Sequence, residues 1–147
     1  MGLEGLNQLY RQVILDAAVN QRYHGKLLNP TAVQLAHNPN CGDVIELQIK
    51  VSDKRITEIA FQGQGCTISQ ASASILADLA LHHSLENVKT KISQFQSMIT
   101  GKEIGEIDQL GDASVFSKIS QFPTRVKCAG LAWDALEQIL KNNQFDQ

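Results

Sequence analysis

The sequence predicts an α+β protein in which a small antiparallel sheet of about three strands packs against helices. Residues 44–51 and 56–63 each alternate apolar and polar side chains, and the short polar turn SDKR separates them. Two such runs joined by a turn indicate a hairpin with one buried face. Segments with helical spacing of apolar residues lie on both sides of this hairpin. Because 147 residues is a typical domain length, we expect a single domain over residues 1–147.

The first expected helix precedes the sheet, and a short strand over residues 31–38 follows it. The helix covers the segment LNQLYRQVILDAA, whose apolar side chains recur at helical spacing: Leu6, Leu9, Tyr10, Val13 and Ala17. In the first hairpin strand, alternation places one set of apolar side chains on the same face: Ile45, Leu47, Ile49 and Val51.

Three further helices are expected after the hairpin. The first is rich in small residues, follows a glycine-containing turn, and has Thr67 or Ser69 available as its N-cap. The second covers residues 86–99. The last begins near Pro123, because proline favours the first helical position. The glycines between these last two helices predict an insertion around residues 100–120 with one short helix.

The charge of the chain excludes some classes of partner. Thirteen basic and fifteen acidic residues give a net charge of −2, and no basic block is present. We therefore expect neither nucleic acid nor an anionic membrane surface as a partner. No segment approaches the length of about eighteen apolar residues needed to span a membrane, and the first residues do not resemble an export signal. We expect a cytoplasmic protein.

Three cysteines, Cys41, Cys66 and Cys128, are the candidates for chemistry. They are odd in number and spread over most of the chain, so metal or thiol chemistry explains them better than a disulfide framework. Cys41 lies on the loop before the hairpin, Cys66 on the loop after it, and Cys128 in the first turn of the last helix. Helix N-termini favour an anion, so we expect Cys66 and Cys128 to become thiolates more readily than a free cysteine.

Asp43 stands two residues after Cys41 and adds a carboxylate to the three thiols. Together they make four donors, the number that a tetrahedral zinc site requires. Plainer interpretations remain open, because a cysteine is often a small buried hydrophobe and an aspartate is often a turn or capping residue. His37 is the alternative ligand. Arg125 and Lys127 flank Cys128 and are either solvated residues or cations that lower the pKa of its thiol.

Three stretches, NPNCGDVI, FQGQGCTISQASAS and FPTRVKCAGLAW, resemble the cysteine motifs of the U-type iron–sulfur assembly proteins. Two features resemble the SufU branch more than the related IscU scaffolds. Lys127 stands where IscU proteins carry a histidine, and the segment around residues 100–120 matches an insertion typical of SufU proteins.

The resemblance implies the SufU/IscU-like fold, with zinc held by Cys41, Asp43, Cys66 and Cys128. It also implies a function as a zinc-dependent sulfurtransferase. Such a protein accepts persulfide sulfur at Cys41 from a pyridoxal-phosphate cysteine desulfurase of the SufS type and relays it to downstream cluster assembly proteins. A histidine of the desulfurase is expected to replace Cys41 on zinc, with Arg125 and Lys127 in supporting roles.

Two other functions use the same residues. A [2Fe–2S] cluster could be built on the three cysteines and Asp43, as in an IscU scaffold, since such clusters favour thiolate ligands. A structural zinc module without transfer activity is the third possibility. Lys127 favours zinc and sulfur transfer over the scaffold, and the loop position of Cys41 argues against a closed structural site.

Overall fold

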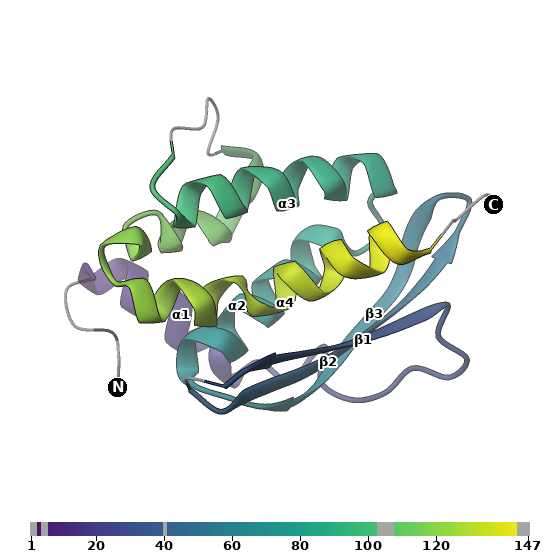
Figure 1. Cartoon of the computed structure of the whole chain (residues 1–147), viewed down its shortest axis with the longest axis horizontal. Helices are drawn as coiled ribbons and strands as arrows, with labels where there is room; N and C mark the ends of the chain where they lie inside the picture. The colour runs from purple at the N-terminus through teal and green to yellow at the C-terminus, as the bar shows by residue number, and fades with distance from the viewer. Residues whose placement is uncertain (1–2, 4–5, 40, 103–107, 144–147) are drawn as a thin grey trace.

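The computed structural model describes residues 3, 6–39, 41–102 and 108–143, and it confirms the predicted α+β class (Figure 1). The elements follow in this order: α1 (Gln8–Val19), β1 (Ala32–Asn38), β2 (Asp43–Ser52), β3 (Arg55–Gln64), α2 (Thr67–Ala80), α3 (Leu85–Ile99), the 3₁₀ helices η1 (Asp108–Phe116) and η2 (Ile119–Gln121), and α4 (Pro123–Asn142). Within the described ranges, no helix combines the length and the apolar character needed to span a membrane.

The sheet is antiparallel in the order β1-β2-β3, as the hairpin pattern predicts. Ile45, Leu47 and Ile49 of β2 are fully buried on the face that the helices cover. Val51 departs from the prediction because it is only half-buried. The pairing of β2 with β3 shifts between Lys50 and Val51, and such a bulge interrupts the alternation of side chains between the two faces.

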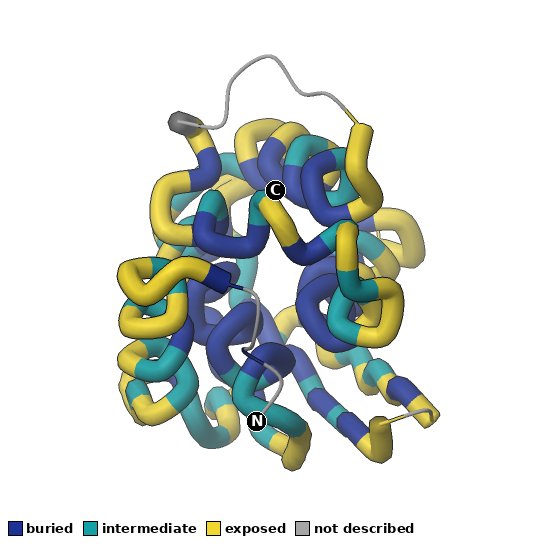
Figure 2. The backbone as a smooth tube through the Cα atoms, turned by 90° about the vertical axis from the view of Figure 1, so that its left-hand side faces the viewer, coloured by how far each residue is buried: buried dark blue, intermediate teal, exposed yellow. Residues whose placement is uncertain are grey.

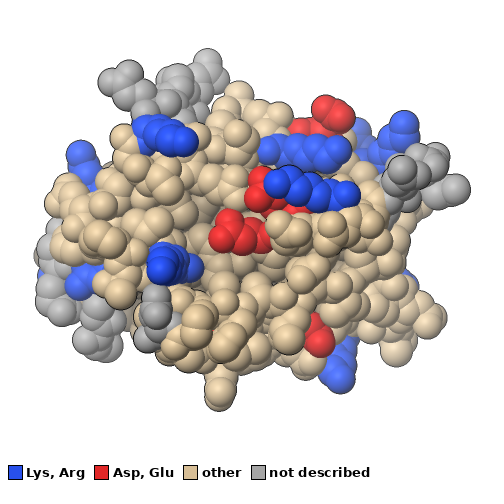
Figure 3. Space-filling view, in the orientation of Figure 1, with Lys and Arg blue, Asp and Glu red and all other residues tan. Residues whose placement is uncertain are grey.

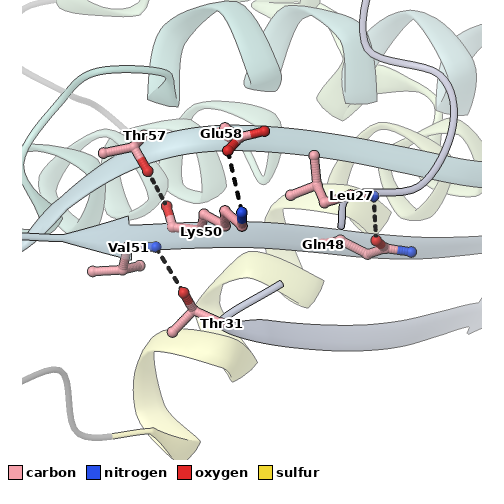
Figure 4. Close-up of polar contacts among 7 residues, drawn as sticks. All are labelled: Leu27, Thr31, Gln48, Lys50, Val51, Thr57 and Glu58. Carbon is pink, nitrogen blue, oxygen red and sulfur yellow. Dashed lines mark hydrogen bonds and ion pairs between the residues drawn. The ribbon is translucent and has the colours of Figure 1, made fainter. Parts of the chain in front are cut away.

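The segment between α1 and β1 covers the outer edge of β3 and crosses the outer face of the sheet. The amide of Phe61 donates to the carbonyl of Tyr23 at 2.9 Å, so this segment pairs with the edge of β3. Farther along, the amide of Leu27 donates to Oε1 of Gln48 at 2.9 Å, and Thr31 Oγ1 accepts from the amide of Val51 at 2.9 Å (Figure 4). An edge strand covered in this way is protected from pairing with other chains.

The helices form a layer on the inner face of the sheet (Figures 1 and 2). Helix α4 contacts β1 and β2, and α2 contacts β3, while α1 packs on α2 and α3 packs on α4. Figure 2 shows the buried backbone concentrated between these layers. At the centre, the ring of Trp133 stacks on Phe95 with the ring centroids 3.9 Å apart, and both side chains are fully buried.

The segment around residues 100–120 contains two short 3₁₀ helices rather than the one predicted, and its residues 103–107 lie outside the described ranges. Helix η1 contacts α1, α2 and α3. Its buried residues include Leu110, Ala113 and Phe116. The described part of this segment therefore belongs to the hydrophobic core.

Ser72 of α2 connects α2 to α4 through buried hydrogen bonds. Its hydroxyl accepts from the indole Nε1 of Trp133 at 2.9 Å and donates to the carbonyl of Ala129 at 2.6 Å. Ser74, two residues on, is also buried, yet its hydroxyl has no hydrogen-bond partner among the described residues. These two serines form a matched pair for a test of the buried hydrogen bonds.

We expect Ser72→Ala to lower the free energy of unfolding by about 1–3 kcal/mol, because it leaves the buried Trp133 N–H without its acceptor. Ser74→Ala removes a hydroxyl with no described partner, so it should be neutral or slightly stabilising. Urea denaturation of the two variants beside the parent protein measures the difference. Equal losses in both variants would contradict this role for Ser72.

Candidate metal centre

Cys41, Asp43 and Cys128 come together at the end of the sheet where β1 ends and β2 begins. Cys66, the fourth predicted ligand, lies beside them at the start of α2, with its sulfur 4.0 Å from Asp43 Oδ2 but outside the group that could share one metal ion. Cys41 and Cys128 are 87 positions apart in the chain, yet their sulfur atoms are 3.5 Å apart. One ligand atom from each of Cys41, Asp43 and Cys128 lies within 4.8 Å of the others. Among the described histidine, cysteine and acidic residues, this is the only cluster with such an arrangement.

Asn38, the last residue of β1, holds the loop that carries Cys41. Its carbonyl accepts the amides of Cys41 at 3.2 Å and of Gly42 at 2.9 Å. Gly42 has a φ of 71°, a conformation that glycine adopts without steric cost. The side-chain amide of Asn38 lies 3.8 Å from the sulfur of Cys128. Sequence reasoning missed Asn38, although an asparagine at the end of a strand is typical of a turn.

Asp43 is completely buried and connects the start of β2 to the start of α2. Its Oδ1 accepts the amide of Cys66 at 2.8 Å, and its Oδ2 lies 4.0 Å from the sulfur of Cys66. Gly65 makes this close approach possible. A Cβ at that position would lie 2.7 Å from Asp43 Oδ1 and would also clash with the hydroxyl of Ser69.

Cys66 is itself the N-cap of α2, so the prediction of Thr67 or Ser69 in that role is wrong. Its sulfur accepts from the amide of Ser69 at 3.5 Å, and the Ser69 hydroxyl donates to the Cys66 carbonyl at 3.0 Å. A hydrogen bond from the Cys128 thiol lowers the pKa of Cys66 to about 6, and the Ser69 donors add to this effect against the cost of burial. The pKa of Cys66 is thus lowered as predicted, but the main cause is Cys128, and the donors at the helix start contribute less.

Cys128 differs from the prediction in position and in pKa. Helix α4 begins at Pro123, which places Cys128 in the second turn rather than the first. Its thiol is 4 % exposed. The hydrogen bond to Cys66 and burial both raise the pKa of Cys128, the opposite direction to the shift at Cys66. The effect of the helix terminus does not reach this far into the helix.

The residues fit a metal that prefers sulfur ligands. A tetrahedral zinc site with Zn–S bonds of about 2.3 Å places two sulfurs about 3.8 Å apart, and Cys41 and Cys128 are close to that separation at 3.5 Å. A buried carboxylate beside thiolates is unfavourable without a compensating cation. Zinc and iron–sulfur clusters both accept this donor set, so the geometry alone does not select between them.

The other predicted site residues lie around this cluster. His37, the alternative ligand, is exposed on β1, pairs with Val44 across the sheet, and lies outside the described metal-binding group. The guanidinium of Arg125 lies over the ring of Phe122 at 4.3 Å from its centroid. Lys127 is exposed and lines a cavity beside the site.

A three-stranded antiparallel sheet covered by helices, with thiols and a carboxylate gathered at its end, defines a small α+β protein with a candidate metal site. A family model described as "NifU-like N terminal domain" matches residues 9–129. The chain therefore belongs to this family of iron–sulfur cluster assembly proteins, which confirms the resemblance seen in the sequence.

Relatives of known name cover nearly the whole chain. The "Iron-sulfur cluster assembly scaffold protein IscU" of Streptococcus pyogenes serotype M1 is 41% identical, over 97% of this chain and 89% of the relative. The "Zinc-dependent sulfurtransferase SufU" of Bacillus subtilis is 40% identical, over 90% of each chain. Relatives at similar identity thus carry the names of both branches.

A solved structure agrees with the fold. The crystal structure of a putative iron–sulfur cluster assembly scaffold protein for the SUF system, from Fervidobacterium islandicum AW-1, superposes with a TM-score of 0.84. The two sequences are 31% identical, and the match covers 88% of this chain and 94% of the other.

Gly65→Ala tests the position of Asp43. We expect this substitution to weaken zinc binding about 10- to 100-fold, because the new Cβ displaces the carboxylate. Gly25→Ala is the control. A Cβ at Gly25 meets no atom within 4 Å, so this substitution strains only the backbone, whose φ there is 131°. It should cost about 1 kcal/mol of stability and leave zinc affinity unchanged. Competition with a zinc-binding dye measures the zinc affinity of both variants and of the parent protein. Equal affinities of Gly65→Ala and the parent protein would contradict the constraint at Gly65.

Proposed function

We propose that this chain accepts persulfide sulfur from a pyridoxal-phosphate cysteine desulfurase of the SufS type and relays it to iron–sulfur cluster assembly. One observation carries the proposal: Cys41 is exposed, whereas Asp43 and Cys128 are buried and Cys66 is half-buried. An acceptor thiol must be reached by the persulfide of a partner, while the remaining ligands keep the metal in place. Cys41 satisfies the first requirement and the other three residues satisfy the second.

Zinc is the metal we propose, held by Cys41, Asp43, Cys66 and Cys128. A bound zinc ion keeps its thiolate ligands deprotonated at neutral pH. The name of the Bacillus subtilis relative, a zinc-dependent sulfurtransferase, supports this choice. Lys127 supports it as well, because the motif resembles the SufU branch at this position, whereas the scaffold branch carries a histidine before its third cysteine.

The transfer itself needs no oxidant or reductant. The Cys41 thiolate attacks the outer sulfur of the desulfurase persulfide, and the bond between the two sulfurs of that persulfide breaks. The electron pair of the broken bond returns to the desulfurase cysteine as a thiolate, and Cys41 becomes the persulfide. We place this reaction in the cytoplasm, where thiols are kept reduced.

The second candidate function is a scaffold for a [2Fe–2S] cluster. The same four donors favour it, since three thiols and a carboxylate also suit iron. The names of relatives support it equally, because the Streptococcus pyogenes protein is called an assembly scaffold. Metal content separates the two candidates.

We expect protein purified without added metal to contain about one zinc per chain. Elemental analysis together with visible absorption spectroscopy measures this. Stoichiometric iron and sulfide, with the absorption bands of a cluster, would instead support the scaffold function.

We expect Cys41→Ser to abolish stimulation of a SufS-type desulfurase while much of the zinc stays bound, because three ligands remain and an oxygen can fill the fourth position. Cys66→Ser and Cys128→Ser should lose zinc and stability together, since these residues join the metal to α2 and α4. Alanine release, zinc content and protein mass are measured for each variant.

The parent protein should gain one sulfur atom on Cys41 that a reductant removes. Stimulation by Cys41→Ser at the parent level would exclude Cys41 as the acceptor. So would an added sulfur that maps to Cys66 or Cys128.

A further inference from the structure

A cavity of about 250 Å³ lies beside the candidate metal centre, between the end of β1 and the first half of α4. Its lining comes from both elements and from the loop that follows β1: His37, Asn38, Pro39, Lys127, Leu131 and Asp134. The volume suits a ligand of amino-acid size.

The cavity shares a wall with the proposed acceptor. Asn38 lines the cavity, its carbonyl holds the amides of Cys41 and Gly42, and its side-chain amide lies 3.8 Å from the Cys128 sulfur. The Cys128 sulfur in turn lies 3.5 Å from that of Cys41. A small molecule bound in the cavity therefore contacts the residue whose carbonyl holds the Cys41 loop.

The cavity contains one cation and one anion. Lys127 supplies an ammonium group, and Asp134, two turns further along α4, supplies a carboxylate that accepts from Gln96 Nε2 at 3.0 Å. Figure 3 shows acidic and basic side chains close together over α3 and α4. Partial desolvation raises the pKa of Asp134, although the residue is exposed, and the negative charge of Glu137 adds to this shift against the opposing hydrogen bond from Gln96. A cation bound in the cavity would offset both effects.

We propose that this cavity binds a small zwitterionic thiol, with its carboxylate at Lys127 and its ammonium at Asp134, and that this thiol removes the sulfur from Cys41. The ammonium and the carboxylate of an α-amino acid, both bonded to its α-carbon, match the opposite charges of the lining. Leu131 and Pro39 supply apolar contact for the carbon atoms between them. The inference rests on the proposed function, because it requires a persulfide on Cys41.

The transfer is a thiol exchange at constant oxidation state. The thiolate of the small molecule attacks the outer sulfur of the Cys41 persulfide, and the bond between the two sulfurs breaks. The electron pair returns to Cys41 as a thiolate, and the small molecule leaves as a persulfide that carries the proton of the transferred sulfur. Cys41 is then ready for another cycle.

The test uses the zinc-loaded protein, charged at Cys41 with inorganic polysulfide, and four thiol probes. L-cysteine has both charges, cysteamine lacks the carboxylate, and 3-mercaptopropionate lacks the ammonium. The rate of persulfide loss, followed by mass spectrometry, should saturate with L-cysteine concentration. With 2-mercaptoethanol, which has neither charge, it should rise linearly.

Each variant should affect only the probes that carry the matching group. We expect Lys127→Gln to slow L-cysteine and 3-mercaptopropionate by about fivefold and to leave cysteamine unchanged. Asp134→Asn should slow L-cysteine and cysteamine by about fivefold and spare 3-mercaptopropionate. A general change in the reactivity of Cys41 would instead slow all the probes equally.

Two variants on α4 outside the cavity lining serve as controls. Glu137 also accepts from Gln96 Nε2, at 3.2 Å, so Glu137→Gln matches Asp134→Asn. Lys141→Gln matches Lys127→Gln on the same helix. Neither control should alter the selectivity among the probes.

Linear kinetics with L-cysteine, or equal effects of a variant on all probes, would overturn the proposal. Charging of the parent protein by a SufS-type desulfurase is measured separately. A protein that the enzyme charges but that shows no selectivity among the thiols contradicts only the cavity proposal. A protein that shows selectivity after chemical charging but is not charged by the enzyme contradicts only the proposed function.

Discussion

The buried carboxylate of Asp43 joins the sheet to the helical layer at the point where the candidate metal site lies. One oxygen holds the amide of Cys66, and the other faces the sulfur of that residue. This contact brings the start of β2 and the start of α2 together, and it depends on the missing side chain at Gly65. A buried carboxylate in such a position is stabilised by a nearby cation, and the thiols at the same end of the fold complete a set of donors that suits a metal ion.

The four candidate donors differ in how far solvent reaches them, and the roles proposed for them rest on this difference. Asp43 and Cys128 are enclosed between the sheet and α4, Cys66 caps α2, and Cys41 projects from a loop that Asn38 holds by its carbonyl. In such a site Asp43 and Cys128 are held in the packed interior, and the thiol of Cys41 stays accessible. The cavity beside it extends the accessible side along α4, away from the buried ligands.

Local patterns in the sequence predict the elements well and their ends less well. Alternation in β2 identifies Ile45, Leu47 and Ile49 as core residues, but the bulge after Lys50 leaves Val51 half-buried. The identity of the N-cap of α2 likewise depends on contacts between a few atoms. The Cys66 sulfur reaches the Ser69 amide because the main chain of Cys66 is already tied to Asp43, and no pattern around Cys66 shows that contact.

The sequence by itself determined the α+β class, the hairpin, the helices and the three cysteine motifs, because these depend on side chains within a few positions of one another. Only the tertiary structure decided that Cys128 lies in the second turn of α4, where the contact with Cys66 and burial raise the pKa of its thiol, and that Lys127 and Asp134 line one cavity with Asn38. Cys41 and Cys128 are 87 positions apart, and their contact depends on how α4 packs against β1 and β2. The pKa of a thiol follows from the charges and donors around it in space, which the order of residues does not specify.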